Sequence, residues 1–390
     1  MTVISKIWYF VTGRIGQFRR LRRALEGVSD VVWVDCPSLG EFEEARPVIM
    51  RMRAIDPKLR FLVTFYSPSG YRNASGDPAA DWVFRTPIDT LCNAKRFLDI
   101  VRPVKAIIAV DEYWLNLLHE LRRRNIDTYL ISARFVPWMW YFKKPGFLYR
   151  DVFRRCFSRI YLKDAKSLKL LGGIGVANAE VAGDPRMDRM KALVDEDWRD
   201  EVVEKWLRGG KAFIAGSTHR EDDPLVAALA EACPEGKFII VPHEVDDCRI
   251  SRLRSGLRCS SALYSSFGEG DEEARVLIVD TVGKLSRIYR YGFAAYVGGA
   301  IGGNPHNVIE PASYGCPVTF GPNIGKYCHC GNLVDCGAGR VVRTPAELLS
   351  WYRELAGSAE ALRKASEAAV TYCAGGLGAA ARIADGILKG

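Results

Sequence analysis

Two stretches decide the fold of this chain: Ser38-Leu39-Gly40-Glu41-Phe42 and, far along the sequence, Val297-Gly298-Gly299-Ala300-Ile301-Gly302-Gly303-Asn304-Pro305-His306-Asn307-Val308-Ile309-Glu310-Pro311. Each follows an apolar run typical of a strand and leads into a segment with helical spacing. A strand, a tight turn and a helix are the repeating unit of a parallel α/β sheet. The two stretches therefore predict two α/β domains, the first with a carboxylate at its turn and the second with a glycine-rich turn.

The same alternation of apolar runs and helical patterns continues along the chain. We expect strands in the first half at Val31–Val34, Phe61–Phe65, Ala106–Val110, Thr128–Ile131 and Ile160–Lys163, and in the second half at Ala212–Ala215, Phe238–Val241, Val276–Val279, Ala294–Val297 and Val318–Phe320. The stretch Val181-Ala182-Gly183-Asp184-Pro185 marks the expected boundary, which predicts domains at residues 1–185 and 186–390. Two Rossmann-like parallel sheets facing each other across a cleft form the GT-B architecture.

Composition narrows the class of protein. The chain has 390 residues, 48% of them hydrophobic, which supports two packed cores and argues against disorder. Its formal net charge of +9 indicates an anionic partner: nucleic acid, a phosphorylated substrate or an anionic membrane. Eleven cysteines, an odd number, fit a reducing compartment. The spacing of Cys328-His329-Cys330 and Cys336 matches no common zinc site, so we expect no metal.

Residues suited to binding a phosphate and a ribose are concentrated in the second half. The four glycines between Gly298 and Gly303 predict a turn whose backbone amides approach a phosphate, and Glu310 is placed to bind a ribose hydroxyl pair. Small and hydroxylic residues also end an earlier strand, in Ala215-Gly216-Ser217-Thr218-His219. Three of the five histidines, His219, His243 and His306, fall in turns after strands. The alternative for the glycine-rich turn is a tight strand-to-helix turn without a ligand, but His306-Asn307 and Glu310-Pro311 in register favour a binding site. A helix cap by Ser217 or Thr218 is compatible with phosphate binding.

Two carboxylates follow strands in the first half. Glu41 comes after Gly40 at a strand-to-helix turn, and Glu112 lies in Asp111-Glu112-Tyr113-Trp114. A carboxylate at a helix start is most often a partner of the helix dipole, worth on the order of 0.5 kcal/mol. The alternative is a general base, and the two carboxylates at strand ends of one sheet are candidates to flank an acceptor.

The chain resembles the Kdo transferases of lipopolysaccharide synthesis, which move Kdo from CMP-Kdo onto a lipid A precursor. The similar stretches keep the family's order and cover most of residues 30–335. They are Ser38–Glu43, Thr64–Tyr71, Pro87–Thr90, Glu112–Trp114, Ile131–Phe135, Val181–Asp184, Ala215–His219, Val279–Gly283 and Gly298–Pro322.

The resemblance implies an inverting GT-B glycosyltransferase without a cofactor, acting at the cytoplasmic face of the bacterial inner membrane. It implies Glu41 as general base and Glu112 as a second essential carboxylate. The implied donor site comprises Ser217, Thr218, His219, His243, Gly298, Gly299, His306, Asn307 and Glu310.

The implied partners are CMP-Kdo, the lipid A precursor and an anionic membrane surface. The family usually opens with a membrane helix, and the apolar run Ile4–Val11 is too short to span a bilayer, so attachment is expected through a surface rich in aromatic and basic residues. The acceptor and membrane candidates are Ser69, Arg134, Lys143, Lys144, Arg154 and Arg155.

Two other readings stay open. One is another GT-B nucleotide-sugar transferase or an epimerase. The second, from a different class, is a basic nucleic-acid-binding protein, although the sequence shows no base-stacking or groove-reading module.

Overall fold

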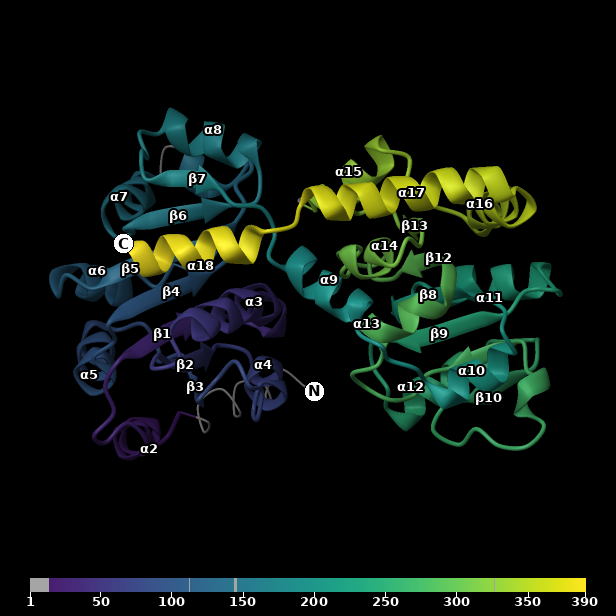
Figure 1. Cartoon of the computed structure of the whole chain (residues 1–390), viewed down its shortest axis with the longest axis horizontal. Helices are drawn as coiled ribbons and strands as arrows, with labels where there is room; N and C mark the ends of the chain where they lie inside the picture. The colour runs from purple at the N-terminus through teal and green to yellow at the C-terminus, as the bar shows by residue number, and fades with distance from the viewer. Residues whose placement is uncertain (1–13, 112, 144–145, 326) are drawn as a thin grey trace. The chain divides into compact units, whose positions relative to one another are not determined.

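The computed structural model of the chain describes residues 14–111, 113–143, 146–325 and 327–390 (Figure 1). The side chains of residues 68, 69, 73, 147 and 148 are also outside this description. The chain forms two compact units. One comprises the residues up to Asp188 together with Gly376–Gly390, and the other is Arg189–Gly375.

The first unit is built on a parallel sheet in the order β3-β2-β1-β4-β5-β6-β7. Both faces of the sheet are covered by apolar clusters, one around Trp33 and the other around Phe61. Its strands are β1 (Val31–Asp35), β2 (Arg60–Phe65), β3 (Trp82–Arg85), β4 (Lys105–Ala109), β5 (Asp127–Ala133), β6 (Arg159–Leu162) and β7 (Ala179–Val181). Its helices are α2 (Gln17–Ala24), α3 (Leu39–Ile55), α4 (Pro68–Asn73), α5 (Leu91–Val101), α6 (Leu115–Arg123), α7 (Phe147–Arg155), α8 (Ala165–Gly173) and α18 (Ala379–Lys389), with a 3-10 turn η1 (Trp140–Phe142).

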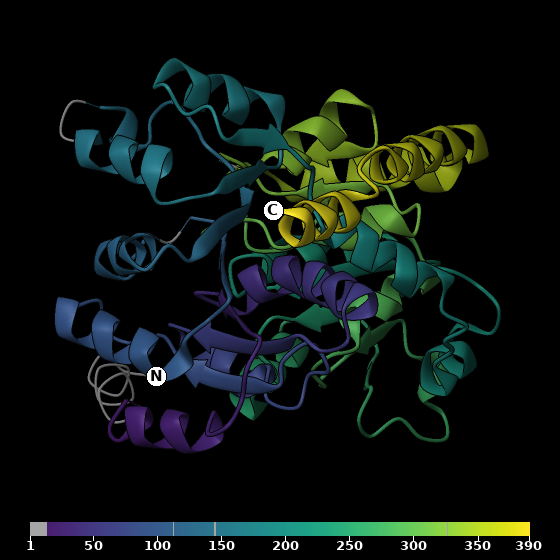
Figure 2. The same cartoon turned by 60° about the vertical axis from the view of Figure 1, so that its left-hand side comes forward.

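The last helix of the chain returns to the first unit. α18 lies alongside α3 (Figures 1 and 2), and its Ile383 and Ile387 are fully buried in the cluster around Phe61. The Asp188 carboxylate accepts hydrogen bonds from the backbone N–H groups of Gly378 and Ala380, which fixes the start of α18. Our prediction that residues 376–390 belong to the second domain is therefore wrong, because α18 presents an apolar face that only the first sheet covers.

The second unit repeats the architecture in the order β10-β11-β9-β8-β12-β13-β14. Its strands are β8 (Ala212–Thr218), β9 (Phe238–Pro242), β10 (Ser261–Leu263), β11 (Val276–Ile278), β12 (Gly292–Val297), β13 (Val318–Phe320) and β14 (Gly339–Val341). Its helices are α10 (Glu201–Leu207), α11 (Asp223–Ala232), α12 (Asp247–Ser255), α13 (Leu285–Ile288), α14 (Ile309–Ser313), α15 (Cys328–Asp335), α16 (Pro345–Gly357) and α17 (Ala359–Gly375), with 3-10 turns η3 (Asp271–Glu273) and η4 (Tyr289–Tyr291). α9 (Arg186–Asp195) begins in the first unit and ends in the second.

The strand predictions are confirmed in kind, because all ten expected strands are present and every pairing is parallel. Parallel strands place their carboxyl ends at one edge of a sheet, where ligands bind in open α/β folds. In the first unit this edge carries the segments after β1 and β4, and in the second unit the segments after β8, β9 and β12.

Candidate functional site

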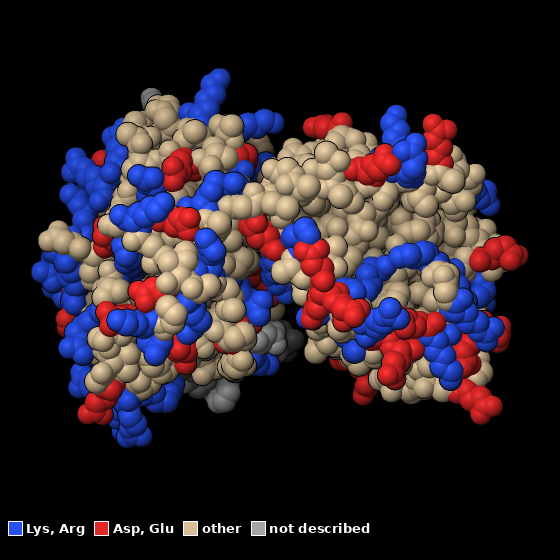
Figure 3. All heavy atoms as spheres, in the orientation of Figure 1, with Lys and Arg blue, Asp and Glu red and all other residues tan. Residues whose placement is uncertain are grey.

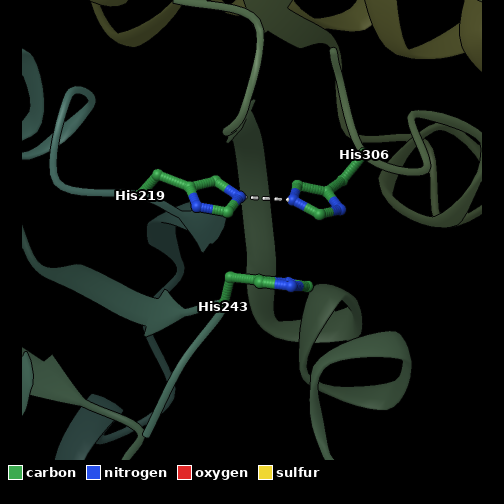
Figure 4. A group of neighbouring side chains, drawn as sticks. All are labelled: His219, His243 and His306. Atoms are coloured by element: carbon green, nitrogen blue, oxygen red, sulfur yellow. Dashed lines mark hydrogen bonds between the residues drawn. The ribbon is translucent and has the colours of Figure 1, made fainter. Parts of the chain in front are cut away.

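Three histidines converge at the carboxyl ends of the strands in the second unit (Figure 4). His219 follows β8, His243 follows β9, and His306 lies in the glycine-rich loop after β12. The Nε2 atoms of His219 and His306 are 2.8 Å apart, and one ligand-type atom from each of the three rings lies within 4.8 Å of the others. His219 and His306 are half-buried, and His243 is exposed. The parallel sheet thus gathers residues that are 87 positions apart into one polar cluster.

A buried carboxylate joins two of these segments, the turn after β8 and the loop after β12. Asp222 accepts hydrogen bonds from the His219 N–H (2.8 Å), the Gly299 N–H (2.9 Å) and the hydroxyl of Tyr296 on β12 (2.6 Å). Asp222 and Tyr296 are both fully buried. Asp222 therefore ties the turn after β8 to the glycine-rich loop. Asp222 has no role in the prediction from the sequence, although it lies three residues after His219.

The first two glycines of the loop are required by packing. A Cβ on Gly298 would lie 2.4 Å from the Ser217 carbonyl oxygen and 2.7 Å from an Asp222 oxygen. Gly299 has φ +97, and a Cβ there would lie 2.3 Å from the Asn304 carbonyl oxygen. The Gly298 N–H bonds the Gly216 carbonyl, and the Gly299 N–H bonds Asp222, so these two amides are engaged within the protein. The predicted reason for the glycines, amides left open for a phosphate, does not hold for these two groups.

The remaining donor-side candidates lie around the histidines. Ser217 is half-buried and has φ 53, in the left-handed region, at an irregularity in the β8–β9 pairing. Thr218 is fully buried, and its hydroxyl has no hydrogen-bond partner among the described residues. Asn307 donates to Glu310 Oε1 (3.2 Å) and accepts from the Ile309 N–H, so these side chains form one unit at the start of α14. Ser217, Asn307 and Glu310 are thus the candidates whose side chains are not fully enclosed.

Two of the three histidines, His306 and His243, have lowered pKa values and are mainly neutral at pH 7. Burial, followed by the neighbouring His243 and His219, lowers the pKa of His306 to about 4. Desolvation and then His219 lower the pKa of His243, against a smaller raising effect of Glu244. Neutral imidazoles can donate or accept hydrogen bonds, and they can also bind metals.

In the first unit, Glu41 belongs to a capping box at the start of α3. Its Oε2 accepts from the Ser38 N–H (2.8 Å) and from the Ser38 hydroxyl, while the Ser38 Oγ accepts from the Gly40 N–H (3.2 Å). This arrangement satisfies amides that the helix leaves open. No partner for Oε1 is found among the described residues, and Glu41 is half-buried. Its proposed role as base stays a prediction, with Oε1 as the available atom.

Glu112 lies outside the described residues, but its surroundings are defined. β4 is followed directly by Val110, whose φ of 71 is a strained value for a β-branched residue. After the predicted carboxylate, the Trp114 Nε1 donates to the fully buried Asp35 (2.8 Å), whose pKa is raised by burial. Asp89 accepts from the N–H groups of Asn116 and Leu117 and so fixes the start of α6. Neither Asp35 nor Asp89 was assigned a role from the sequence.

A pocket of about 420 Å³ opens beside this segment. It is lined by aromatic rings together with a few polar groups: Asp89, Asp111, Tyr113, Trp114, Leu115, Asn116, Trp140, Tyr141 and Tyr149. Aromatic walls with few polar groups are typical of small-molecule sites.

The predicted acceptor and membrane residues differ in their surroundings. Arg134 pairs with Asp164 (3.2 Å), and Arg154 donates to the Ile174 carbonyl. Lys143 and Arg155 are exposed, whereas the side chain of Ser69 and all of Lys144 lie outside the described residues. Lys and Arg are dense on the face of the first unit that Figure 3 shows. Trp138 and Trp140, which precede α7 in the sequence, are 61% and 49% exposed. Within the described residues, no helix combines the length and hydropathy needed to cross a bilayer.

The chain is similar in sequence to a family of known proteins. Residues 11–189 match the family described as 3-Deoxy-D-manno-octulosonic-acid transferase (kdotransferase). The chain is 25% identical over 355 residues to a 3-deoxy-D-manno-octulosonic acid transferase of Aquifex aeolicus, covering 87% of this chain and 91% of that protein. It is 22% identical over 347 residues to the enzyme of that name from Rickettsia typhi, covering 85% and 73%.

The chain is related to the Kdo transferases. This relationship makes it a glycosyltransferase and confirms the resemblance noted from the sequence. The chain is also 23% identical over 334 residues to a bifunctional glycosyltransferase/methyltransferase of Fusobacterium nucleatum, covering 81% of this chain and spanning 50% of that longer protein.

Solved structures confirm the GT-B fold. The UDP-GlcNAc 2-epimerase of Neisseria meningitidis, bound to UDP-GlcNAc, aligns with a TM-score of 0.66 at 14% identity, over 92% of this chain and 100% of that one. MurG of Acinetobacter baumannii aligns with a TM-score of 0.56 at 13% identity, over 92% and 99%. At these identities the likeness is one of fold alone.

Proposed function

We propose that this chain transfers Kdo from CMP-Kdo to a lipid A precursor, with inversion at the sugar carbon, at the cytoplasmic face of the bacterial inner membrane. The observation that carries the proposal is the match of residues 11–189 to the Kdo transferase family, together with relatives of that name that align over most of both units. The basic surface of the first unit suits an anionic acceptor and an anionic membrane.

The donor is assigned to the second unit. Departure of CMP leaves charge on its phosphate, and polar groups held in advance at that position lower the barrier. The imidazoles of the three-histidine cluster, at the carboxyl ends of β8 and β9, are suited to donate hydrogen bonds to this phosphate. The Asn307–Glu310 pair beside them is suited to the hydroxyl groups of a ribose.

The acceptor is assigned to the first unit. In the proposed step, Glu41 Oε1 takes the proton of the acceptor hydroxyl as its oxygen bonds to the sugar carbon. The bond from that carbon to the phosphate oxygen breaks at the same time, and the electron pair leaves with CMP. The pocket of about 420 Å³ in the same unit is lined by aromatic rings, including Trp114 and Trp140, against which an acceptor sugar can pack.

The test is incubation of the purified chain with CMP-Kdo and a tetra-acylated lipid A precursor, with product masses read by mass spectrometry. We expect the acceptor to gain the mass of one or more Kdo residues. A parallel reaction with UDP-GlcNAc tests for epimerisation. If no lipid product forms and UDP-GlcNAc is turned over, the proposal is wrong and the chain is an epimerase.

A further inference from the structure

The His219–His306 contact is a hydrogen bond between two nearly coplanar rings. The ring planes differ by 11°, the centroids are 5.1 Å apart, and the two Nε2 atoms are 2.8 Å apart. Such a contact needs one proton, with one nitrogen as donor and the other as acceptor. While the bond lasts, an additional proton is accommodated only on the outer Nδ1 of the donating ring. The pair is therefore built to carry zero or one positive charge.

His243 lies against the face of this pair. Its ring centroid is 4.8 Å from that of His219 and 4.5 Å from that of His306, with planes inclined by 33° and 28°. Figure 4 shows this ring edge-on below the other two, so its face is turned toward the Nε2 atoms. A metal ion lies in the plane of each imidazole that binds it, and His243 turns its ring face rather than a ring nitrogen toward the Nε2 atoms. The arrangement therefore does not suit a metal shared by the three rings.

Among the described residues, the surroundings of the cluster hold more acidic groups than basic ones. The buried Asp222 is bonded directly to the backbone of His219, and the guanidinium of Arg249, which reaches the Thr218 carbonyl, is paired with Asp223 at 2.7 Å. The amides of Gly298 and Gly299 are already bonded. The charged residues beside the cluster histidines and on the first turns of α12 and α14 are Arg220, Glu221, Asp222, Asp223, Glu244, Asp246, Asp247, Arg249 and Glu310. Acidic groups outnumber basic ones in this set, so an anion bound at the cluster gains from a positive charge on the histidines.

We propose that the His219–His306 pair takes up one proton when a cytidylate phosphate binds, so that affinity for the donor increases as the pH falls. This inference rests on the proposed function, because it assumes that the donor phosphate binds at the cluster. In the free protein, burial lowers the pKa of His306 to about 4, so this ring is uncharged near pH 7. A bound anion favours the charged form of the pair and raises its pKa. Between the free and bound pKa values, uptake of one proton weakens binding up to tenfold for each unit of rising pH.

The experiment is isothermal titration calorimetry of the full chain with the methyl phosphodiester of CMP. This probe is a diester and keeps a single negative charge across the range studied, so any proton comes to the protein. Titrations at pH 7.5 in buffers of different ionisation enthalpy give the number of protons as the slope of heat against that enthalpy. We expect uptake of about one proton, and a dissociation constant that rises about tenfold from pH 7 to pH 8.

Variants separate the cluster from the rest of the chain. His306→Gln and, independently, His219→Gln are expected to abolish the uptake and to flatten the pH dependence, with folding checked by circular dichroism. The matched control is His119→Gln, an exposed histidine on α6 of the first unit, which is expected to leave both unchanged.

Each alternative outcome is distinguishable. Binding without proton uptake overturns this inference and leaves the proposed function standing. No binding of the probe to a chain that is active with CMP-Kdo also overturns it, whereas no binding and no activity removes the proposed function itself. Binding that EDTA abolishes and zinc restores makes the cluster a metal site and overturns the proton proposal.

Discussion

Replacing Glu41 by glutamine separates the two roles that this side chain can have. The carboxylate accepts two hydrogen bonds from Ser38 through Oε2, as the third helical residue of a capping box. Glutamine serves the same purpose in such boxes, because its amide oxygen accepts from the N-cap residue. The helix start is therefore preserved in Glu41→Gln, while the ability to take a proton is lost.

The expected magnitudes differ by a wide margin. Loss of a general base lowers transfer by about 10²–10⁴-fold. The stability cost of Glu41→Gln is on the order of 0.5 kcal/mol, since only the charge near the helix dipole is removed. Ser38→Ala is the matched control, because it removes the N-cap hydroxyl at a cost of about 0.5–2 kcal/mol and leaves the carboxylate in place.

The assay is initial rates of Kdo transfer for both variants, with urea unfolding followed in parallel. We expect Glu41→Gln to be stable and nearly inactive, and Ser38→Ala to be less stable and to keep most of its activity at saturating substrate. Near wild-type turnover in Glu41→Gln would show that the carboxylate is only a cap. A loss of activity that follows stability in both variants would refute the reasoning in the same way.

Three further perturbations test the surroundings of the two candidate sites. Gly298→Ala places a Cβ 2.4 Å from a carbonyl oxygen and 2.7 Å from Asp222, so we expect a loss of at least 2 kcal/mol in unfolding free energy, on the order of other overpacked positions, and a weaker donor complex by calorimetry. Asp35→Ala leaves three donors without their buried acceptor, at about 1–3 kcal/mol each, which urea unfolding measures. Replacing Lys143 and Arg155 by serine is expected to reduce sedimentation with anionic vesicles by several-fold, at about 1 kcal/mol per charge, while cytidylate affinity is unchanged; equal sedimentation would exclude this surface as the membrane contact.

The sequence predicted the inner strands well because they are buried on both faces and read as continuous apolar runs. The strands it missed are short strands toward the edges of the two sheets. β7 (Ala179–Val181) and β14 (Gly339–Val341) are each three residues long and partly exposed, so no hydrophobic period develops. The pair Asp280-Thr281 is typical of a helix start and predicts a helix through Tyr291, but only the short α13 and η4 form there, because the residues from Asp280 to Lys284 form an irregular turn.

The segments that form the candidate site were predicted from the sequence, but the contacts that hold them together were not. Residue types placed the histidines and glycines at strand ends, and the structure joins His219, His243 and His306 in one cluster. The role of Asp222 was out of reach, because its three hydrogen-bond partners come from the turn after β8, from β12 and from the loop that follows β12. Such contacts depend on the crossover that places β8 beside β12, which periodicity does not specify.

Backbone strain at the end of β8 offers a test of whether that turn serves a ligand. Ser217 is held at φ 53, a conformation that costs a residue with a side chain about 1 kcal/mol relative to glycine. If the turn is structural, Ser217→Gly stabilises the second unit by about that amount and leaves cytidylate affinity unchanged. If the hydroxyl binds the donor phosphate, the same variant is more stable and yet binds at least tenfold more weakly, since a hydrogen bond to a charged group contributes about 1.5–3 kcal/mol. Ser217→Ala keeps the strain and removes only the hydroxyl, so it is expected to reproduce the loss of affinity without the gain in stability. We expect this second pattern from urea unfolding and calorimetry; unchanged affinity in both variants would assign Ser217 to the turn alone.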